Sequence, residues 1–336
     1  MVSEVKTPAP AGAGAPSAPP AKVSLFQRYL RPMVGVVIVV ALMVIGGLTA
    51  PAFATLSNLM SVIRAASITG IVALGLTFVT ISGNYFSLSV TQTAILSSVV
   101  YGWLASTSDF FVAFLVTVVI CIVVGAIQGA IVGVRGNAVI VTLAAGAAIL
   151  GIVLLMTDSV RVRLTAPADG LAVAVGRSTP LGIPMATWAF VILAIVAHLL
   201  LQRTTLGRRI ILTGANKNTA TAAGFDVRLL TIAAFTISAI TAGLAGILTV
   251  AEFGVADTAQ FPGLDINAVA AVLVGGTAIK GGQGSIIQTC IGAVFISLLR
   301  NYLQIIGLST GAQLVFVGGA VVLAVSAYAL VKGARR

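Results

Sequence analysis

The chain has 336 residues, of which 59% are hydrophobic and only 8% are charged. A soluble globular domain carries about 25% charged residues, so this composition excludes a soluble protein and predicts an all-α polytopic membrane protein. The net charge of +11 would suit a nucleic-acid-binding protein. The basic residues cluster in short loops and tails, however, which is typical of membrane topology signals. We therefore expect contact with membrane lipid and no nucleic-acid partner.

The first part of the chain predicts a tail followed by a helix. Residues 1–24 are rich in Pro, Ala, Gly and Ser, a composition typical of disorder, and we expect 1–32 to form a disordered cytoplasmic tail. The first apolar run, 33–50, is followed by Ala-Phe-Ala at 52–54, which resembles a signal-peptidase site. Because the tail and the run are both long for a signal peptide, a retained helix is favoured over a cleaved signal.

Apolar runs of about 20 residues, the length that spans a bilayer, recur through the chain. They predict about ten transmembrane helices in one domain, 33–331, followed by a short cytoplasmic tail, 332–336. The expected spanning segments are 33–50, 59–81, 87–106, 111–134, 138–156, 186–202, 229–251, 267–279, 285–306 and 311–331.

One face of the segment 111–134 is lined by glycine. Gly125, Gly129 and Gly133 recur at every fourth position, which places them on the same side of a helix. Small residues on one face let helix backbones approach closely in lipid. We therefore expect this segment to pack against another helix, and a contact with a solute is the alternative.

The eighth segment is short and ends in a glycine cluster. Gly275, Gly276 and Thr277 follow it, and further glycines lie within 281–284. A short segment interrupted by glycine predicts a discontinuous helix near 267–280, of the kind that lies beside a translocation path in transporters. A tight turn between two helices is the alternative, and both descriptions can hold together.

The distribution of charge predicts the orientation of the chain. An even number of helices puts both chain ends on one side of the membrane. With both ends in the cytoplasm, the inner side receives most of the basic residues, above all those of the loop 203–228, and the outer side receives most of the acidic ones. The exceptions, basic residues that fall on the outer side, are Arg64, Arg161, Arg163, Arg177 and Arg300. We expect both termini to be cytoplasmic.

The loop 203–228 combines positive charge with signals for a short helix. Asn216 or Asn218 can cap a helix start. Alanines favour a helix interior, and Gly224 suits the left-handed position that ends one. The charged residues are Arg203, Arg208, Arg209, Lys217 and Arg228, with Asp226 as the single acid. The pattern predicts a short, small-faced helix, bracketed by Gly214 and Gly224, at the inner membrane surface. A solvated connector that carries topogenic charge is the alternative.

The chain carries no signature of catalysis. His198 is its single histidine, and the sequence contains no catalytic motif and no cluster of residues at metal-ligand spacing. We therefore expect no enzyme activity, no metal site and no cofactor. The predicted helix interiors also lack acidic residues, which pumps coupled to protons or sodium usually need. The energy for transport would then come from a separate subunit, or transport would be passive.

Several motifs in a fixed order resemble a known family. They lie at 214–225, 242–247, 264–272, 275–277 and 281–285. Over 56–330 the chain resembles the transmembrane permease subunit of an ABC importer of the ribose/monosaccharide type, within the branched-chain amino acid/monosaccharide permease family. The resemblance implies that 214–225 is the segment that docks into the ATPase.

The resemblance also implies a location and a set of partners. It implies a multi-pass permease subunit in the bacterial inner membrane, with ATP hydrolysed by a separate cytoplasmic ABC ATPase. Its other implied partners are an external or periplasmic solute-binding protein and a second permease subunit, either a second copy or a sister chain. The residues expected to couple to the ATPase are Arg208, Arg209, Gly214, Asn216, Lys217, Asn218, Ala220, Ala223 and Gly224.

The N-terminal half departs from the family pattern. Ser87 stands where the family usually has an acidic residue, and Gln128 stands where asparagine is common. The residues expected along the translocation path are Asn84, Ser87, Gln128, Asn267, Gly275, Gly276 and Thr277. Neutral polar groups suit a neutral hydroxylated solute, so we expect a sugar or polyol. Nucleosides or branched-chain amino acids are alternatives within the family, and a secondary transporter or channel is the alternative outside it.

Overall fold

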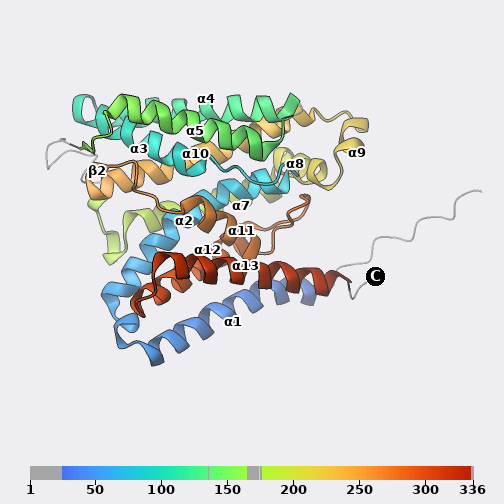
Figure 1. Cartoon of the computed structure of the whole chain (residues 1–336). Helices are drawn as coiled ribbons and strands as arrows, with labels where there is room; N and C mark the ends of the chain where they lie inside the picture. The colour runs from blue at the N-terminus through green and yellow to red at the C-terminus, as the bar shows by residue number, and fades with distance from the viewer. Residues whose placement is uncertain (1–24, 135, 165–173, 175, 334–336) are drawn as a thin grey trace, which may run out of the picture.

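The structure, a computed structural model, describes residues 25–134, 136–164, 174 and 176–333. Helices that lie side by side make up most of it (Figure 1). They are α1 (Leu25–Thr49), α2 (Leu56–Ile81), α3 (Val90–Thr107), α4 (Phe110–Val134), α5 (Ala138–Thr157), α7 (Met185–Arg203), α8 (Thr205–Ala215), α9 (Lys217–Ala222), α10 (Val227–Phe253), α11 (Leu264–Val274), α12 (Ile286–Ile305) and α13 (Thr310–Gly333), with short 3-10 helices η1 (Pro51–Ala54) and η2 (Pro180–Gly182).

Within the described residues the strands are limited to one short antiparallel pair. β1 (Val162–Arg163) lies beside β2 (Val255–Ala256), with Val162 opposite Ala256. An ion pair between Arg161 and Asp257, with Nε and Oδ2 2.7 Å apart, flanks this pair. The N–H of Ala259, which donates a hydrogen bond to Asp257, is the main cause that lowers the pKa of this carboxyl. The Arg161–Asp257 ion pair therefore stays charged at neutral pH and links the chain after α5 to the chain after α10.

The predicted class, an all-α polytopic membrane protein, is confirmed. Six described helices are long and apolar enough to cross a membrane: α2, α4, α5, α7, α10 and α12. Shorter apolar helices cover Gly35–Thr49, Leu264–Val274 and Thr310–Ser326. Each predicted segment overlaps a helix, but the count of about ten spans does not follow from length and apolarity. α3 mixes Ser and Thr into its apolar sequence, and α11 has only 11 residues.

The helix α10 forms the centre of the bundle. It packs against α2, α3 and α4, while α2 also packs against α12 and α7. In the most apolar 18-residue window of each helix, 78% of α2 and 67% of α10 are buried inside the chain, against 22% of α4 and of α5. α2 and α10 are therefore core helices, whereas α4 and α5 turn apolar side chains outward, as lipid-facing helices do. In Figure 1, α4 and α5 lie along one side of the bundle and α1 and α13 along the other.

The glycine face of α4 packs closely against α10. A Cβ atom added at Gly125 would lie 2.7 Å from the Cα of Thr236, and one at Gly129 would lie 2.6 Å from the Cα of Ile232. Side chains do not tolerate such distances, so only glycine lets the two backbones approach in this way. The prediction that Gly125, Gly129 and Gly133 serve helix packing is confirmed.

Two predicted boundaries at the chain ends differ from the structure. α1 begins at Leu25, so the residues 25–32 are helical and the predicted tail is too long at this end. Leu, Gln and Arg favour helix there, and a helix can continue beyond its apolar part. The rest of the predicted tail, 1–24, lies outside the described residues. At the other end α13 continues to Gly333, and 334–336 lie outside the described residues.

The predicted end of the helix over 229–251 is also too early. α10 continues to Phe253 and so includes Glu252. An ion pair between Glu252 and Arg64 of α2 explains this extension, because a paired carboxylate can remain in a helix that lies against its neighbour. The prediction concerned helix interiors, and the structure adds two acidic residues at helix ends: Glu252 in the last turn of α10 and Asp265 in the first turn of α11.

Candidate translocation path and coupling segment

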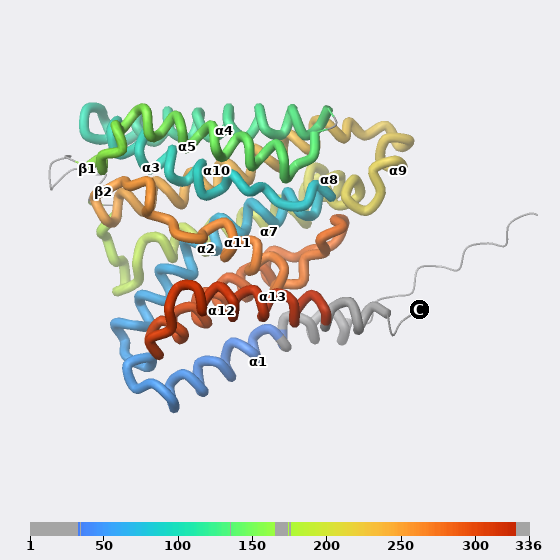
Figure 2. Tube along the Cα trace, in the orientation of Figure 1, coloured from blue at the N-terminus to red at the C-terminus, as the bar shows by residue number. Residues whose placement is uncertain are grey.

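The loop 203–228 folds into the two short helices α8 and α9, which lie together at one end of the bundle (Figure 2). The Asn216 side chain caps α9. Its Oδ1 accepts hydrogen bonds from the N–H of Asn218 at 3.0 Å and from the N–H of Thr219 at 3.1 Å. The predicted short helix is confirmed, with Asn216 rather than Asn218 at its start.

The two glycines expected to bracket this helix have different roles. Gly214 lies inside α8, because the break between α8 and α9 falls at Asn216, whose backbone is extended. The predicted start at Gly214 is therefore wrong. Gly224 takes the left-handed conformation, with φ of +79°, directly after Ala223 and ends the helix as predicted.

Exposure divides the predicted coupling residues into two groups. Ala220 is only 3% exposed and packs within the chain, so its methyl group is not available to a partner. Gly214 is partly buried, because it packs against the backbone of Ile81 and Gly282. The exposed members are Arg208, Arg209, Asn216, Lys217, Asn218, Ala223 and Gly224. The guanidinium of Arg209 lies 5.5 Å from the centre of the Phe225 ring, a cation–π contact that orients it beside α9.

Two predicted path residues, Ser87 and Gln128, are joined through Ser89. The hydroxyls of Ser87 and Ser89 are 3.1 Å apart, and the Ser89 hydroxyl donates to Oε1 of Gln128 at 2.8 Å. All three side chains are buried. Among the described residues, Nε2 of Gln128 has no hydrogen-bond partner. The cluster therefore presents a buried donor that a solute oxygen can accept from.

Asn84 is buried in the segment that follows α2 and reaches α9. Its Nδ2 donates to the hydroxyls of Ser82 at 3.0 Å and Thr231 at 3.3 Å, and its Oδ1 accepts from Nζ of Lys217 at 2.7 Å. Lys217 is exposed as a residue, but partial burial of its ammonium lowers its pKa. Asn84, which is predicted to line the path, thus accepts a hydrogen bond from Lys217, which is predicted to couple to the ATPase. No sequence signal indicates this contact, because the two residues are 133 positions apart.

The predicted discontinuous helix is shorter than expected. α11 ends at Val274, and the chain from 275 to 285 forms a loop rather than the end of a helix over 267–280. Glycine explains the break: Gly276 has φ of +78°, a conformation that side chains disfavour. A Cβ atom at Gly275 would lie 2.6 Å from the carbonyl oxygen of Gln288, so glycine also lets α12 approach.

Two further path residues are buried here, Asn267 on α11 and Thr277 in the loop that follows it. Within the described residues, Oδ1 of Asn267 and the hydroxyl of Thr277 have no hydrogen-bond partner. The Thr91 hydroxyl accepts from the N–H of Asp265 at 3.0 Å and so ties the start of α11 to α3. Asn267 therefore lies on a helix that is anchored to α3, the helix that follows Ser87, and Thr277 lies in the loop directly after that helix.

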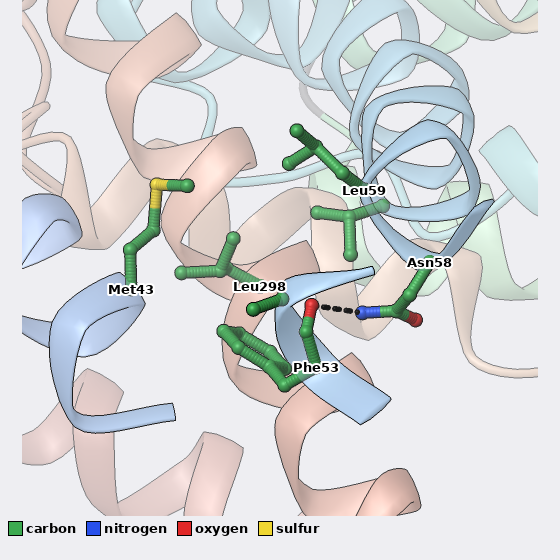
Figure 3. Close-up of a pocket in the computed structure, with 7 residues that line it drawn as sticks. Met43, Phe53, Asn58, Leu59 and Leu298 are labelled. Atoms are coloured by element: carbon green, nitrogen blue, oxygen red, sulfur yellow. Dashed lines mark hydrogen bonds between the residues drawn. The ribbon is translucent and has the colours of Figure 1, made fainter. Parts of the chain in front are cut away.

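A separate cavity of about 150 Å³ lies between α1, η1, α2 and α12 (Figure 3). Its lining is almost entirely apolar: Met43, Phe53, Ala54, Asn58, Leu59, Val62 and Leu298. The Asn58 amide donates to the carbonyl of Phe53 and to Oδ1 of Asn301, both at 2.9 Å, so this polar group is satisfied by the protein. None of the predicted path residues lines this cavity, which arises from the packing of α1 and η1.

Comparison with known proteins identifies the class. Residues 58–325 match the family described as the branched-chain amino acid transport system / permease component. The ribose import permease protein of Escherichia coli K12 is 31% identical over 306 residues, which cover 89% of this chain and 94% of the relative. The D-allose transport system permease protein of the same strain is 31% identical over 296 residues, or 86% and 89% of the two chains.

A more distant relative agrees with these matches. The L-arabinose transport system permease protein of Escherichia coli K12 is 27% identical over 316 residues, which cover 93% of each chain. No solved structure matches the chain. The resemblance to ribose-type permeases and the prediction of a permease subunit rather than an enzyme are confirmed by these matches. The chain therefore belongs to the family of branched-chain amino acid transport system permease components, as a multi-pass bacterial membrane protein.

Proposed function

We propose that this chain is the permease subunit of an ABC importer that carries a sugar or polyol across the bacterial inner membrane. The observation that carries the proposal is the identity of 31% over 89% of the chain to a ribose import permease. The allose and arabinose permeases support the same class of solute. The subunit supplies the membrane path, and a separate cytoplasmic ATPase supplies the energy.

The chemistry of the proposed path supports a neutral solute. The proposed path residues are Asn84, Ser87, Gln128, Asn267, Gly275, Gly276 and Thr277, and none is charged. Amides and hydroxyls donate to and accept from the hydroxyl groups of a sugar. An amino acid would bring a carboxylate and an ammonium, which need charged or strongly polarised partners when they leave water. This comparison favours a sugar or polyol over the branched-chain amino acids named in the family description.

The proposed coupling site is the exposed surface of α8 and α9. Arg208, Arg209, Asn218 and Ala223 are exposed there, which supports a role in docking the ATPase. The small side chain of Ala223 lets a partner backbone approach closely. Ala220 would support this surface from within. An external solute-binding protein and a second permease subunit would complete the importer on the other side and within the membrane.

Orientation can be tested by cysteine labelling. We propose ten spans with both termini and the α8–α9 segment in the cytoplasm, supported by the basic residues of 203–228. In a background that lacks Cys121 and Cys290, we expect an Asn218→Cys protein in intact cells to resist an impermeant thiol reagent. A Ser108→Cys protein, on the turn after α3, should react. Labelling at 218 from outside would contradict the orientation.

The solute is tested with the cognate binding protein and the reconstituted importer. Sugars, polyols, nucleosides and branched-chain amino acids are screened for thermal stabilisation of the binding protein, because a ligand stabilises the folded state it binds. The compound that stabilises is then supplied, radiolabelled, to vesicles that contain the permease, its ATPase and ATP. We expect uptake of a sugar or polyol that requires ATP hydrolysis. Uptake of leucine or isoleucine instead would contradict the proposed solute.

A further inference from the structure

Three segments that are far apart in the sequence meet backbone to backbone beside α8. The N–H of Gly282 donates to the carbonyl oxygen of Ile81, the last residue of α2, at 2.8 Å. A Cβ atom added at Gly281 would lie 2.6 Å from the Cα of Gly83 and 3.0 Å from the carbonyl oxygen of Gly214. We call Gly83, Gly214 and Gly281 the glycine junction. It joins the end of α2, the end of α8 and the loop 275–285.

The close contact between backbones makes the glycine junction rigid. No side chain lies between these backbones, so a shift of one segment cannot be absorbed by a change of rotamer. A Cβ atom at Gly214 would also lie 2.7 Å from the backbone nitrogen of Gly282 and would overlap the carbonyl of Ile81. Movement at the end of α8 must therefore move the end of α2 and the loop 275–285 or break the contacts.

A side-chain contact lies beside the junction and reinforces it. Lys217 is the first residue of α9, and its ammonium donates to Asn84, which follows Gly83 directly. Asn84 in turn donates to Thr231 of α10. A hydrogen bond from a charged donor is stronger than one between neutral groups, and partial burial strengthens it further. Lys217 therefore ties α9 to the segment between α2 and α3, which also carries Ser87.

We infer that the Lys217–Asn84 contact, together with the glycine junction, transmits the movement of the α8–α9 surface to the polar residues of the path. This inference rests on the proposed function of α8 and α9 as the surface that docks the ATPase. Lys217 is a positioning residue: it reaches inward to Asn84 and not outward to a partner. Two elements respond to this movement: the segment 82–89, which carries Asn84 and Ser87, and the loop 275–285, which contains Thr277.

The test uses the complete importer in vesicles, with its ATPase and with loaded binding protein. ATP hydrolysis and uptake are measured per assembled transporter for the wild type, Lys217→Met, Lys217→Arg and Lys280→Met. Lys280 is the matched control, since it is an exposed lysine on the loop 275–285. We expect Lys217→Met to lower the stimulation of ATP hydrolysis by loaded binding protein, and to lower uptake, by about 5- to 150-fold, the usual range for coupled sites. Lys217→Arg should keep most of the stimulation and most of the uptake. Lys280→Met should resemble the wild type.

A double substitution separates transmission from simple stabilisation. If Lys217 acts through Asn84, the Lys217→Met/Asn84→Ala protein should be no worse than the worse single variant, because both changes remove one contact. Losses that multiply would overturn the inference. So would wild-type stimulation in Lys217→Met, or in Lys217→Gln if the methionine variant does not assemble. A wild-type complex that shows no stimulation by loaded binding protein would instead contradict the proposed function itself.

Discussion

Glu252, in the last turn of α10, forms an ion pair with Arg64 of α2. Glu252 is the only acidic residue in the six described helices that are long and apolar enough to span a membrane. The side chain of Glu252 is 13% exposed and that of Arg64 is 36% exposed, so the pair is partly shielded from solvent. Its carboxylate is paired with a fixed cation, whereas the carboxylates of ion-coupled pumps face a pathway along which an ion moves.

Uptake should therefore not depend on an ion gradient. In vesicles with constant internal ATP, collapse of the proton and sodium gradients with ionophores is expected to leave the rate of solute uptake unchanged. Removal of ATP should abolish uptake, because the described spanning helices offer no free carboxylate to couple an ion to transport. Uptake that stops with the gradients while ATP is still hydrolysed would indicate a secondary transporter.

Removal of Arg64 alone should destabilise the fold. Arg64→Met leaves the Glu252 carboxylate unpaired, at a cost below the roughly 3–5 kcal/mol of a fully buried pair, since Arg64 is partly exposed. The Arg64→Met/Glu252→Gln protein should recover much of the loss, because no charge remains without a partner. Thermal unfolding of the detergent-solubilised proteins measures the loss of stability in Arg64→Met and its recovery in the double variant. A double variant that is less stable than Arg64→Met would show that the unpaired Glu252 carboxylate does not cause the loss of stability.

Gly214→Ala should impair the protein although alanine favours helix. In an exposed helix interior this change stabilises by about 1 kcal/mol. At Gly214 the new Cβ would overlap the carbonyl of Ile81, so we expect a lower melting temperature and less uptake. Gly151→Ala in α5 is the matched control, since beyond the adjacent residues and backbone of its own helix nothing lies within 4 Å of the position of its Cβ. Equal behaviour of the two variants would argue against close packing at Gly214.

Ser87 and Gln128 should influence which solute is transported. Alanine at both positions removes neutral hydrogen-bonding groups, each worth about 0.5–1.5 kcal/mol, or roughly 2- to 10-fold in affinity. We expect the ratio of uptake between two related sugars to change by about that factor. Ser98→Ala is the control, because Ser98 is equally buried on α3 but its hydroxyl bonds the carbonyl of Ile95 in its own helix. An unchanged uptake ratio in the double variant would mean that neither Ser87 nor Gln128 lines the proposed path.

Features that depend on neighbouring residues follow well from the sequence. The apolar runs coincide with helices, because each helix forms its backbone hydrogen bonds within one segment. The glycine face of α4, the cap at Asn216 and the left-handed Gly224 are also local in origin. The membership of the permease family, read from the order of several motifs, is confirmed by its matches.

Features that depend on distant contacts do not follow from the sequence. Ala220 resembles its neighbours in type, and only the packing of α9 on the chain shows that it is buried. Gly214 reads as a helix boundary, but it is required inside α8 by the approach of Ile81. The contacts of Lys217 with Asn84 and of Arg64 with Glu252 join residues from separate helices or loops, and no periodicity marks them.

The most direct test of the account concerns Ala223 on the exposed surface of α9. Nothing in the described chain needs a small residue there for folding, so Ala223→Glu should insert in the membrane at normal levels. In a docked complex the glutamate would become a buried, unpaired charge, at a cost of roughly 2–5 kcal/mol. Ala223→Ser, which stays small and neutral, is the control.

ATP hydrolysis is measured in vesicles that contain the permease and its ATPase, with and without loaded binding protein. We expect loaded binding protein to stimulate hydrolysis in the wild type and in Ala223→Ser, and to have no effect in Ala223→Glu, which should also lose uptake. Stimulation of the Ala223→Glu complex to the wild-type level would contradict the account and would mean that α8 and α9 only connect two membrane helices.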